Sequence, residues 1–240
     1  MGGVYMRESI KRIAQQFIVS HFPESDVALL GGSAVYGNVT TESDIDIIII
    51  DETETPRLEC YHFLGWKIEA FIYTALSLEL EFQTARYKGM PTIIKMCAEG
   101  VLIEDKHGDG KEVQREAKML YDQGPKLWDE DKIDAARYQI TDFLSDFRCS
   151  EDFEESFFIL NKLINTLTEL ILRVDGNWYG EGKWVARNLK SYDKDLSDKL
   201  AKYTKDYVKT NDKTELISFI QSTLDKYGGQ LFAGYKGYFF

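Results

Sequence analysis

The sequence has little cysteine, little proline and no long apolar run, and each shortage excludes a class of protein. Only three of its 240 residues are cysteine and four are proline. Cys60, Cys97 and Cys149 are widely spaced and odd in number, so we expect reduced thiols of a cytoplasmic protein, without a disulfide framework or a CxxC metal site. No apolar run exceeds four residues, as in Ile47–Ile50, and the first twelve residues lack an apolar signal core. Neither a membrane-spanning segment nor a secretory signal is therefore expected.

Basic residues are also in short supply. The chain carries 29 Lys and Arg against 40 Asp and Glu, a formal net charge of -11. Nonspecific binding to duplex nucleic acid depends on clustered basic side chains, so a polynucleotide partner is not expected. An acidic protein suits a cationic substrate, or an enzyme that gathers divalent metal ions.

The first half of the sequence has the mixed pattern of a sheet domain. A helix is predicted at 6–20 from apolar residues at helical spacing, and further helices at 76–86 and 92–98. Strands are predicted at 27–30, 45–50, 66–73 and 101–104; the run at 45–50 is apolar on both faces, which is typical of a buried central strand.

The second half is helical throughout. Segments with 3.6-residue periodicity lie near 112–121, 131–148, 152–174, 183–209 and 213–227. Gly124-Pro125 is the clearest break between the two patterns. We therefore predict an α+β protein, with a mixed-sheet domain at 1–125 followed by a C-terminal helical bundle domain at 126–240.

One segment combines two features that suit a bound phosphate. Gly31-Gly32-Ser33 follows a predicted strand, and a glycine turn allows backbone amides to approach an anion closely, with the hydroxyl of Ser33 as a further donor. A helix that began there would add its N-terminal dipole. After ten intervening residues come Asp44 and Asp46, which share one face of the next predicted strand.

Paired carboxylates at the start of an apolar strand are costly unless a cation compensates them. Divalent ions with oxygen ligands are the natural compensators, most often Mg²⁺ when phosphates supply the remaining ligands. An amide-rich turn and metal-binding carboxylates in this order together indicate a site for a nucleoside triphosphate.

The pattern Gly32-Ser33, a ten-residue spacer and Asp44-Ile45-Asp46 resembles the DNA polymerase β-like nucleotidyltransferase superfamily. In that superfamily a third carboxylate lies on a neighbouring strand, and Glu69 in Trp66-Lys67-Ile68-Glu69 fits it. The strand around Glu69 is similar to that of the kanamycin nucleotidyltransferases, and the aminoglycoside and lincosamide nucleotidyltransferases also append a helical domain.

The resemblance implies an enzyme that transfers a nucleoside monophosphate, AMP above all, from a triphosphate to a hydroxyl of a small molecule such as an aminoglycoside-like antibiotic. Two Mg²⁺ ions would be bridged by Asp44 and Asp46, and Glu69 would hold the one nearer the acceptor. Gly32 and Ser33 would bind the β- and γ-phosphates. Each acid also has an ordinary interpretation, as a residue at the start of a strand or on a half-exposed strand.

Two helical segments supply further candidates. Asp142 and Asp146 lie one turn apart, and either could act as the general base that relatives often take, as a Glu, from the helical domain; a solvated acidic face is the alternative. Lys183, Arg187 and Lys190 form a basic helix face that could bind the triphosphate, or could pair with nearby Asp residues. The three histidines are isolated, and we assign them no role.

Two other functions remain open at this stage. The acceptor could be a protein side chain or an RNA 3′ end, although the acidic charge disfavours RNA. Alternatively, the chain could be a non-catalytic nucleotide-binding protein, such as one partner of a toxin–antitoxin pair. The sequence leaves the acceptor, the preferred nucleotide and the oligomeric state undefined.

Overall fold

The computed structural model describes residues 2–36 and 43–237, with side chains from residue 9 onward. Most of the spacer between the glycine turn and Asp44, and the last three residues of the aromatic tail, therefore lie outside the described residues. Contacts within the chain define two compact units, Met1–Gly124 and Pro125–Phe240. The expected combination of a mixed sheet and a C-terminal helical region is confirmed.

The first unit is built on a sheet to which the described residues contribute five strands in the order β3-β4-β2-β1-β5. The strands are β1 (Val27–Leu30), β2 (Asp44–Ile50), β3 (Arg57–Phe63), β4 (Trp66–Tyr73) and β5 (Val101–Asp105). Only β2 and β4 run parallel, and the other neighbours are antiparallel. The sheet is therefore mixed, with β2 at its centre.

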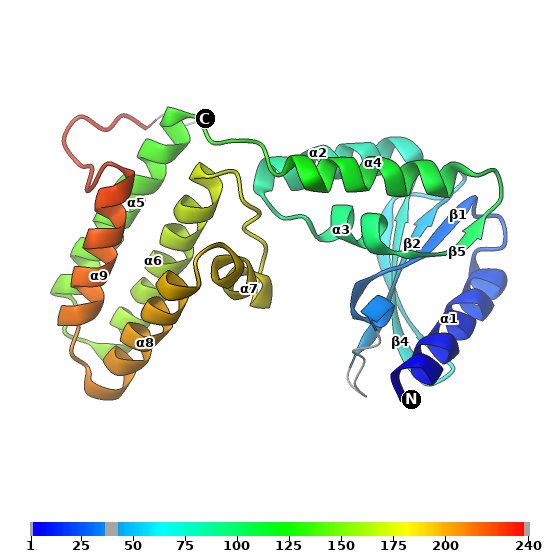
Figure 1. Cartoon of the computed structure of the whole chain (residues 1–240), viewed down its shortest axis with the longest axis horizontal. Coiled ribbons are helices and arrows are strands. Elements are labelled where there is room, and N and C mark those ends of the chain that lie inside the picture. The colour runs from blue at the N-terminus through cyan, green and yellow to red at the C-terminus, as the bar shows by residue number, and fades with distance from the viewer. Residues whose placement is uncertain (1, 37–42, 238–240) are drawn as a thin grey trace. The chain divides into compact units, whose positions relative to one another are not determined.

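Helices cover both faces of this sheet (Figure 1). They are α1 (Gly2–His21), α2 (Ala75–Lys88), α3 (Thr92–Glu99) and α4 (Asp109–Gln123). Ile10, Ala14 and Phe17 of α1 share a buried cluster with Ile45, Ile47 and Ile49 of β2. Alternate residues of a strand point to opposite faces, so Asp44, Asp46 and Ile48 point away from α1.

Strand β3 was not predicted, and it forms one end of the sheet. Its apolar residues fall on both faces, because Tyr61 and Phe63 pack beside α1 while Leu58 is exposed on the other side. A regular alternation is therefore absent. The turn to β4 is Leu64-Gly65, and both residues have positive φ, 51° and 84°. Two-residue turns of this kind match the twist of an antiparallel hairpin.

The second unit is helical in its described residues. Its helices are α5 (Glu130–Cys149), α6 (Phe153–Val174), α7 (Lys183–Tyr192), α8 (Lys194–Thr210) and α9 (Thr214–Leu224), followed by the 3₁₀ turn η2 (Asp225–Tyr227). Sixteen buried residues drawn from all five helices form its core. The helix predicted at 183–209 is wrong in one respect, since it is interrupted at Asp193, whose side chain caps α8 by accepting from the amide of Leu196 at 2.9 Å.

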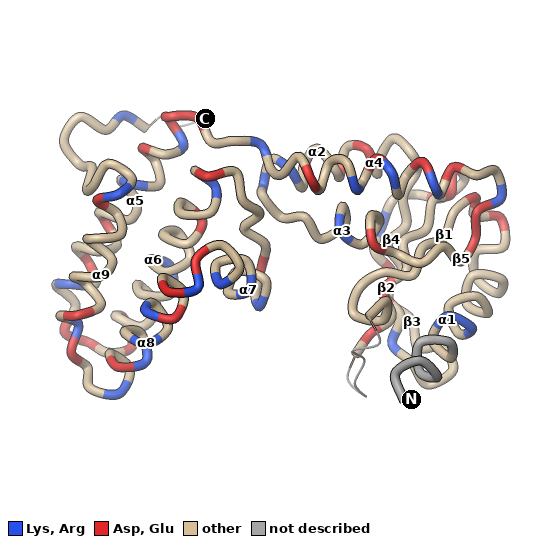
Figure 2. The backbone as a smooth tube through the Cα atoms, in the orientation of Figure 1, with Lys and Arg blue, Asp and Glu red and all other residues tan. Residues whose placement is uncertain are grey.

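Charged residues of both signs are interspersed along the helices of this unit (Figure 2). On α8, Lys194 pairs with Asp198 and Lys199 pairs with Asp195, at 2.6 and 2.7 Å. These pairs are exposed, so each contributes little to stability. Within residues 2–36 and 43–237, we find no helix with the length and apolarity needed to cross a membrane.

Candidate functional site

The three predicted carboxylates lie on two adjacent strands. β2 and β4 pair in parallel register, with Asp44 opposite Lys67 and Asp46 opposite Glu69. In-register partners share a face of the sheet, as do residues two apart on one strand. Asp44, Asp46, Glu69 and Lys67 therefore share the face that points away from α1.

The exposure of this face changes along the strands. Ile48 and Ile50 of β2 are buried, whereas Asp44 and Asp46 at its start are half-buried. On β4, Tyr73 is half-buried, and burial, with smaller contributions from Glu81 and Cys97, raises the pKa of its hydroxyl. The carboxylates therefore lie at the less enclosed end of the face.

The pKa of Glu69 is raised above its ordinary value. The main cause is partial burial, and the negative charge of Asp44 is the second. Both causes penalise the ionised carboxylate, and a cation placed among these groups would relieve both. The charge of Asp44 thus disfavours the ionised form of Glu69.

The glycine turn lies against Asp46, one of these three acids. The amide of Gly31 donates to the carbonyl of Asp46 at 2.8 Å, which fixes the end of β1 against β2. Gly32 has φ +61°, and a Cβ at this position would lie 1.7 Å from Oδ2 of Asp46. Glycine is therefore required at position 32, both by its backbone conformation and by the approach of Asp46.

Ser33 follows within the short 3₁₀ segment η1 (Gly32–Tyr36) and is half-buried. The helix that we allowed for after the turn is thus a single 3₁₀ segment of five residues. Its dipole is correspondingly small, so the backbone amides and the hydroxyl of Ser33 remain as the groups suited to a phosphate.

The carboxylate oxygens at this site suit a metal ion that also binds oxygen atoms of a ligand. Across the part of the chain that the structure describes, no three His, Cys, Asp or Glu side chains form a ready-made metal site. Mg²⁺ commonly takes only one or two carboxylates from the protein and the remaining oxygens from water and substrate phosphates. Asp44, Asp46 and Glu69 offer hard oxygen ligands of that kind, so the residues present fit the group.

The candidates of the second unit are all exposed. Asp142 and Asp146 lie one turn apart on the solvent-facing side of α5. Lys183, Arg187 and Lys190 lie on α7. The guanidinium of Arg187 lies over the ring of Trp184 at 4.8 Å, and Lys190 faces Asp198 at 4.0 Å, so two of the three basic residues already have contacts within the unit.

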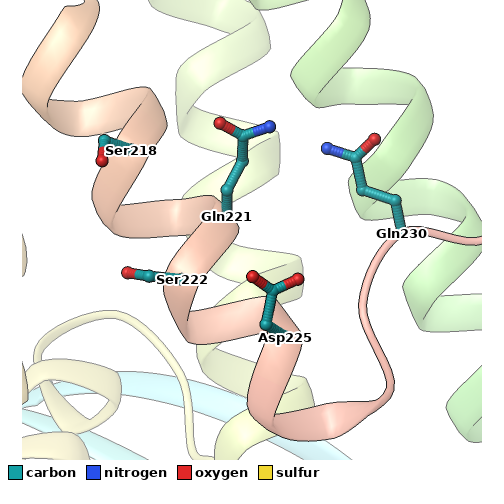
Figure 3. Close-up of a pocket in the computed structure, with 5 residues that line it drawn as sticks. All are labelled: Ser218, Gln221, Ser222, Asp225 and Gln230. Atoms are coloured by element: carbon teal, nitrogen blue, oxygen red, sulfur yellow. The ribbon is translucent and has the colours of Figure 1, made fainter.

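The same unit contains a polar hollow of about 520 Å³ that no sequence pattern indicated. It is lined by Ser218, Gln221, Ser222, Asp225 and Gln230. Figure 3 shows the amides of Gln221 on α9 and Gln230 on the following segment pointing toward each other. None of the predicted site residues lines this hollow.

One residue of the first unit was missed. Lys67 lies directly beside Asp44 across the β2–β4 pairing, on the face that carries all three acids. The signal was present in the sequence, because the alternation of Trp66-Lys67-Ile68-Glu69 assigns Lys67 and Glu69 to one face. Its position next to Asp44 depends on the register of two strands that are distant in sequence.

Comparisons with known proteins add little to this site. No protein-family model matches the sequence, and no curated protein matches it. Among solved structures, the chain is similar to a nucleotidyltransferase-like protein from Exiguobacterium sibiricum 255-15, with a TM-score of 0.49 and 10% identity over 91% of this chain and 74% of that one. A similarity at this level carries no argument about function.

Proposed function

We propose that the first unit binds a nucleoside triphosphate and transfers its nucleoside monophosphate to a hydroxyl group. The observation that carries this proposal is the close approach of the glycine turn to Asp46. Gly32 leaves no room for a Cβ beside Asp46, and Asp46 is in register with Glu69. A phosphate-binding turn and a set of metal-binding carboxylates are thereby joined in one small region.

In the proposed reaction, the acceptor oxygen forms a bond to the α-phosphorus, and the bond from that phosphorus to the bridging oxygen breaks. Pyrophosphate leaves with the bonding electrons, and the hydroxyl proton passes to a base. Two Mg²⁺ ions held by Asp44, Asp46 and Glu69 would lower the pKa of the acceptor hydroxyl and offset the charge on the phosphates. The chain itself positions the reactants and excludes alternative geometries.

The individual residues have distinct tasks in this proposal. The amides of the glycine turn and the hydroxyl of Ser33 bind the β- and γ-phosphates, which keeps the α-phosphate beside Asp44 and Asp46. ATP is the proposed donor, and the proposed acceptor is a small molecule of the aminoglycoside-like kind that the sequence resemblance implies.

The test is a direct search for transfer. The purified chain is incubated with Mg²⁺, each labelled ribonucleoside triphosphate and a panel of hydroxyl compounds, and nucleotide adducts are detected by mass. The double variant Asp44→Ala/Asp46→Ala should lose transfer while its circular dichroism is unchanged. The matched control, Asp195→Ala/Asp198→Ala on α8, also removes two acids and should retain transfer.

Two results would contradict the proposal. Transfer that persists in the Asp44→Ala/Asp46→Ala variant would show that the metal assignment is wrong. Nucleotide binding without transfer to any compound would instead favour a non-catalytic nucleotide-binding protein.

A further inference from the structure

Helix α2 has an exposed face whose residues follow a heptad pattern. Leu76, Leu80, Gln83 and Tyr87 are separated by four, three and four residues, so they share one side of the helix. Leu76 is 67% exposed, Leu80 and Tyr87 are each 59% exposed, and Gln83 is exposed as well. We call these four residues the outer stripe of α2. Their spacing is typical of a helix that packs along a second helix.

The opposite side of α2 is buried in the first unit. Leu78, Phe82 and Ala85 lie on that side. A capping box begins the helix at Thr74, and Gly89, with φ 71°, ends it. Since both ends and the inner side of α2 are fixed in this way, the outer stripe belongs to a well-defined helix whose rotation is set by its buried residues.

The charged residues beside the outer stripe are self-complementary. At 100° per residue, Glu79 and Arg86 lie along one flank of the stripe. Glu81 and Lys88 lie along the other flank. On both flanks the acid precedes the base by seven residues, which is about 10 Å along the helix axis. Each flank is therefore acidic toward the start of α2 and basic toward its end.

This arrangement favours a second copy of α2 that runs antiparallel to the first. A two-fold axis perpendicular to both helices brings the same flank of each copy together. Glu79 then lies beside Arg86 of the second copy, and Glu81 beside Lys88 of the second copy. A parallel copy would instead bring acid toward acid and base toward base, which is unfavourable.

Gln83 lies near the middle of the outer stripe, between the acidic and the basic positions. The two-fold axis that pairs these charges therefore passes close to Gln83, which meets its own copy. A side-chain amide both donates and accepts hydrogen bonds, so two copies of Gln83 are able to bond to each other. A single polar residue in an otherwise apolar helix seam fixes its register.

We propose that the outer stripe of α2 is an interface between two copies of this chain, paired antiparallel about a two-fold axis. A helix of 14 residues is about 21 Å long, so the interface is small. Interfaces of this size are typical of transient association, and we expect a dissociation constant of about 10–100 µM. The stripe contains none of the candidate site residues, so this inference does not depend on the proposed function.

Sedimentation of the full chain over a range of concentrations is the first test. The average mass should rise from that of a monomer toward that of a dimer. Leu80→Glu places a charge in the seam and should weaken association about tenfold or more. The matched control is Val19→Glu on α1, which is 70% exposed and should associate like the parent. Both variants should keep the circular dichroism of the parent.

Charge reversal distinguishes a second copy from any other occupant. Glu79→Lys and Arg86→Glu each bring like charges together, and each alone should remain monomeric. When the two variants are mixed, one copy carries two bases on this flank and the other two acids, so association should return. Recovery that appears only in the mixture requires two copies of α2 in contact.

A second pair of variants guards against damage to the fold. Nε of Arg86 also donates to the carbonyl of Gly124 at 3.1 Å, so the urea midpoint of Arg86→Glu is measured. Glu81→Lys and Lys88→Glu repeat the experiment on the other flank. The inference is overturned if the parent stays monomeric up to about 500 µM, well above the expected dissociation constant. It is also overturned if Leu80→Glu associates like the parent, or if neither mixture recovers.

Discussion

Gly32 lies so close to Asp46 that a methyl group on the α-carbon of Gly32 would overlap the carboxylate of Asp46. A Cβ on Gly32 would lie 1.7 Å from Oδ2 and 2.8 Å from Cγ of Asp46. Any ligand that accepts hydrogen bonds from the backbone amides of the turn therefore also lies close to the carboxylate of Asp46.

The first prediction concerns this contact. Gly32→Ala should destabilise the protein and displace Asp46, and so lower nucleotide affinity, because φ is +61° and the new methyl group overlaps the carboxylate. The matched control is Gly65→Ala, which has φ +84° and nothing within 4 Å of its Cβ. Backbone strain alone costs about 1–2 kcal/mol at either site.

Urea denaturation and titration with a fluorescent ATP analogue measure the two effects. Gly32→Ala should lose more stability than Gly65→Ala, and it alone should lose nucleotide affinity. Equal losses in both variants would mean that the contact with Asp46 is unimportant.

The second prediction concerns the titration of Glu69. Its pKa is raised by burial and by Asp44, so the folded protein binds this proton more tightly than the unfolded chain. Stability from this group is therefore lost as the pH rises from the ordinary pKa of a Glu through the raised value. Glu69→Gln should be more stable than the parent protein above that range and should show a smaller decrease across it.

Carbon-13 NMR of the Glu69 carboxyl group checks the cause. Asp44→Asn should lower the pKa of Glu69, since it removes one of the two causes. Mg²⁺ with a non-hydrolysable nucleotide should lower it further in the parent protein. A pKa of Glu69 that does not respond to Mg²⁺ and nucleotide would argue against a metal ion at these acids.

The third prediction concerns a lysine that joins three segments of the helical unit. Nζ of Lys213 donates to the carbonyl of Phe147 at 2.7 Å, to the hydroxyl of Ser156 at 2.8 Å and to the carbonyl of Ser150. It also lies 4.8 Å above the ring of Phe147. Lys213→Met leaves these acceptors unsatisfied and should cost about 2–3 kcal/mol in thermal or urea denaturation.

Lys205→Met is the control for this variant, because Lys205 is exposed on α8. It should change stability by less than about 0.5 kcal/mol. Similar values for the two variants would mean that the three hydrogen bonds of Lys213 contribute nothing.

The fourth prediction concerns the C-terminal segment. Arg137 on α5 donates to the carbonyls of Gly228 and Gly229, and Tyr235 stacks on Tyr138 with ring centroids 4.3 Å apart. Arg137→Ala should release this segment and increase its cleavage by a low concentration of protease, as followed by mass spectrometry. Arg148→Ala, on the same helix, should leave the cleavage rate unchanged, and equal cleavage of both variants would contradict the role of Arg137.

The sequence predicted the elements whose pattern reflects their burial. The run Ile47–Ile50 is apolar on both faces, and β2 is indeed the central strand with helices on both sides. Strand β3 was missed because its apolar residues do not alternate regularly with polar ones. Leu58 and Tyr61 point to opposite faces of this edge strand, so no single apolar face marks it in the sequence. The interruption of the helix at Asp193 was missed because no Gly or Pro marks it, although Asp is a favoured capping residue.

The spacing in the sequence identified the acids of the candidate site, but it did not predict how they are arranged across the sheet. Alternation placed Asp44 with Asp46, since they lie on one strand. That Asp46 is opposite Glu69, and Glu69 opposite Cys60, depends on pairing across a sheet whose register no local pattern encodes. The contact of Gly32 with Asp46 likewise arises from the folded chain alone.

The Leu64-Gly65 turn determines which side chains of β3 face each side of the sheet. Phe63 is paired with Trp66, so the loop holds only two residues, and its length sets the register of β3 against β4. Shifting that register by one residue would turn Leu58, Cys60 and His62 toward α1 and expose Tyr61 and Phe63. An insertion or deletion of one residue in this turn would therefore exchange the two faces of β3, whereas a substitution on either face would leave them in place.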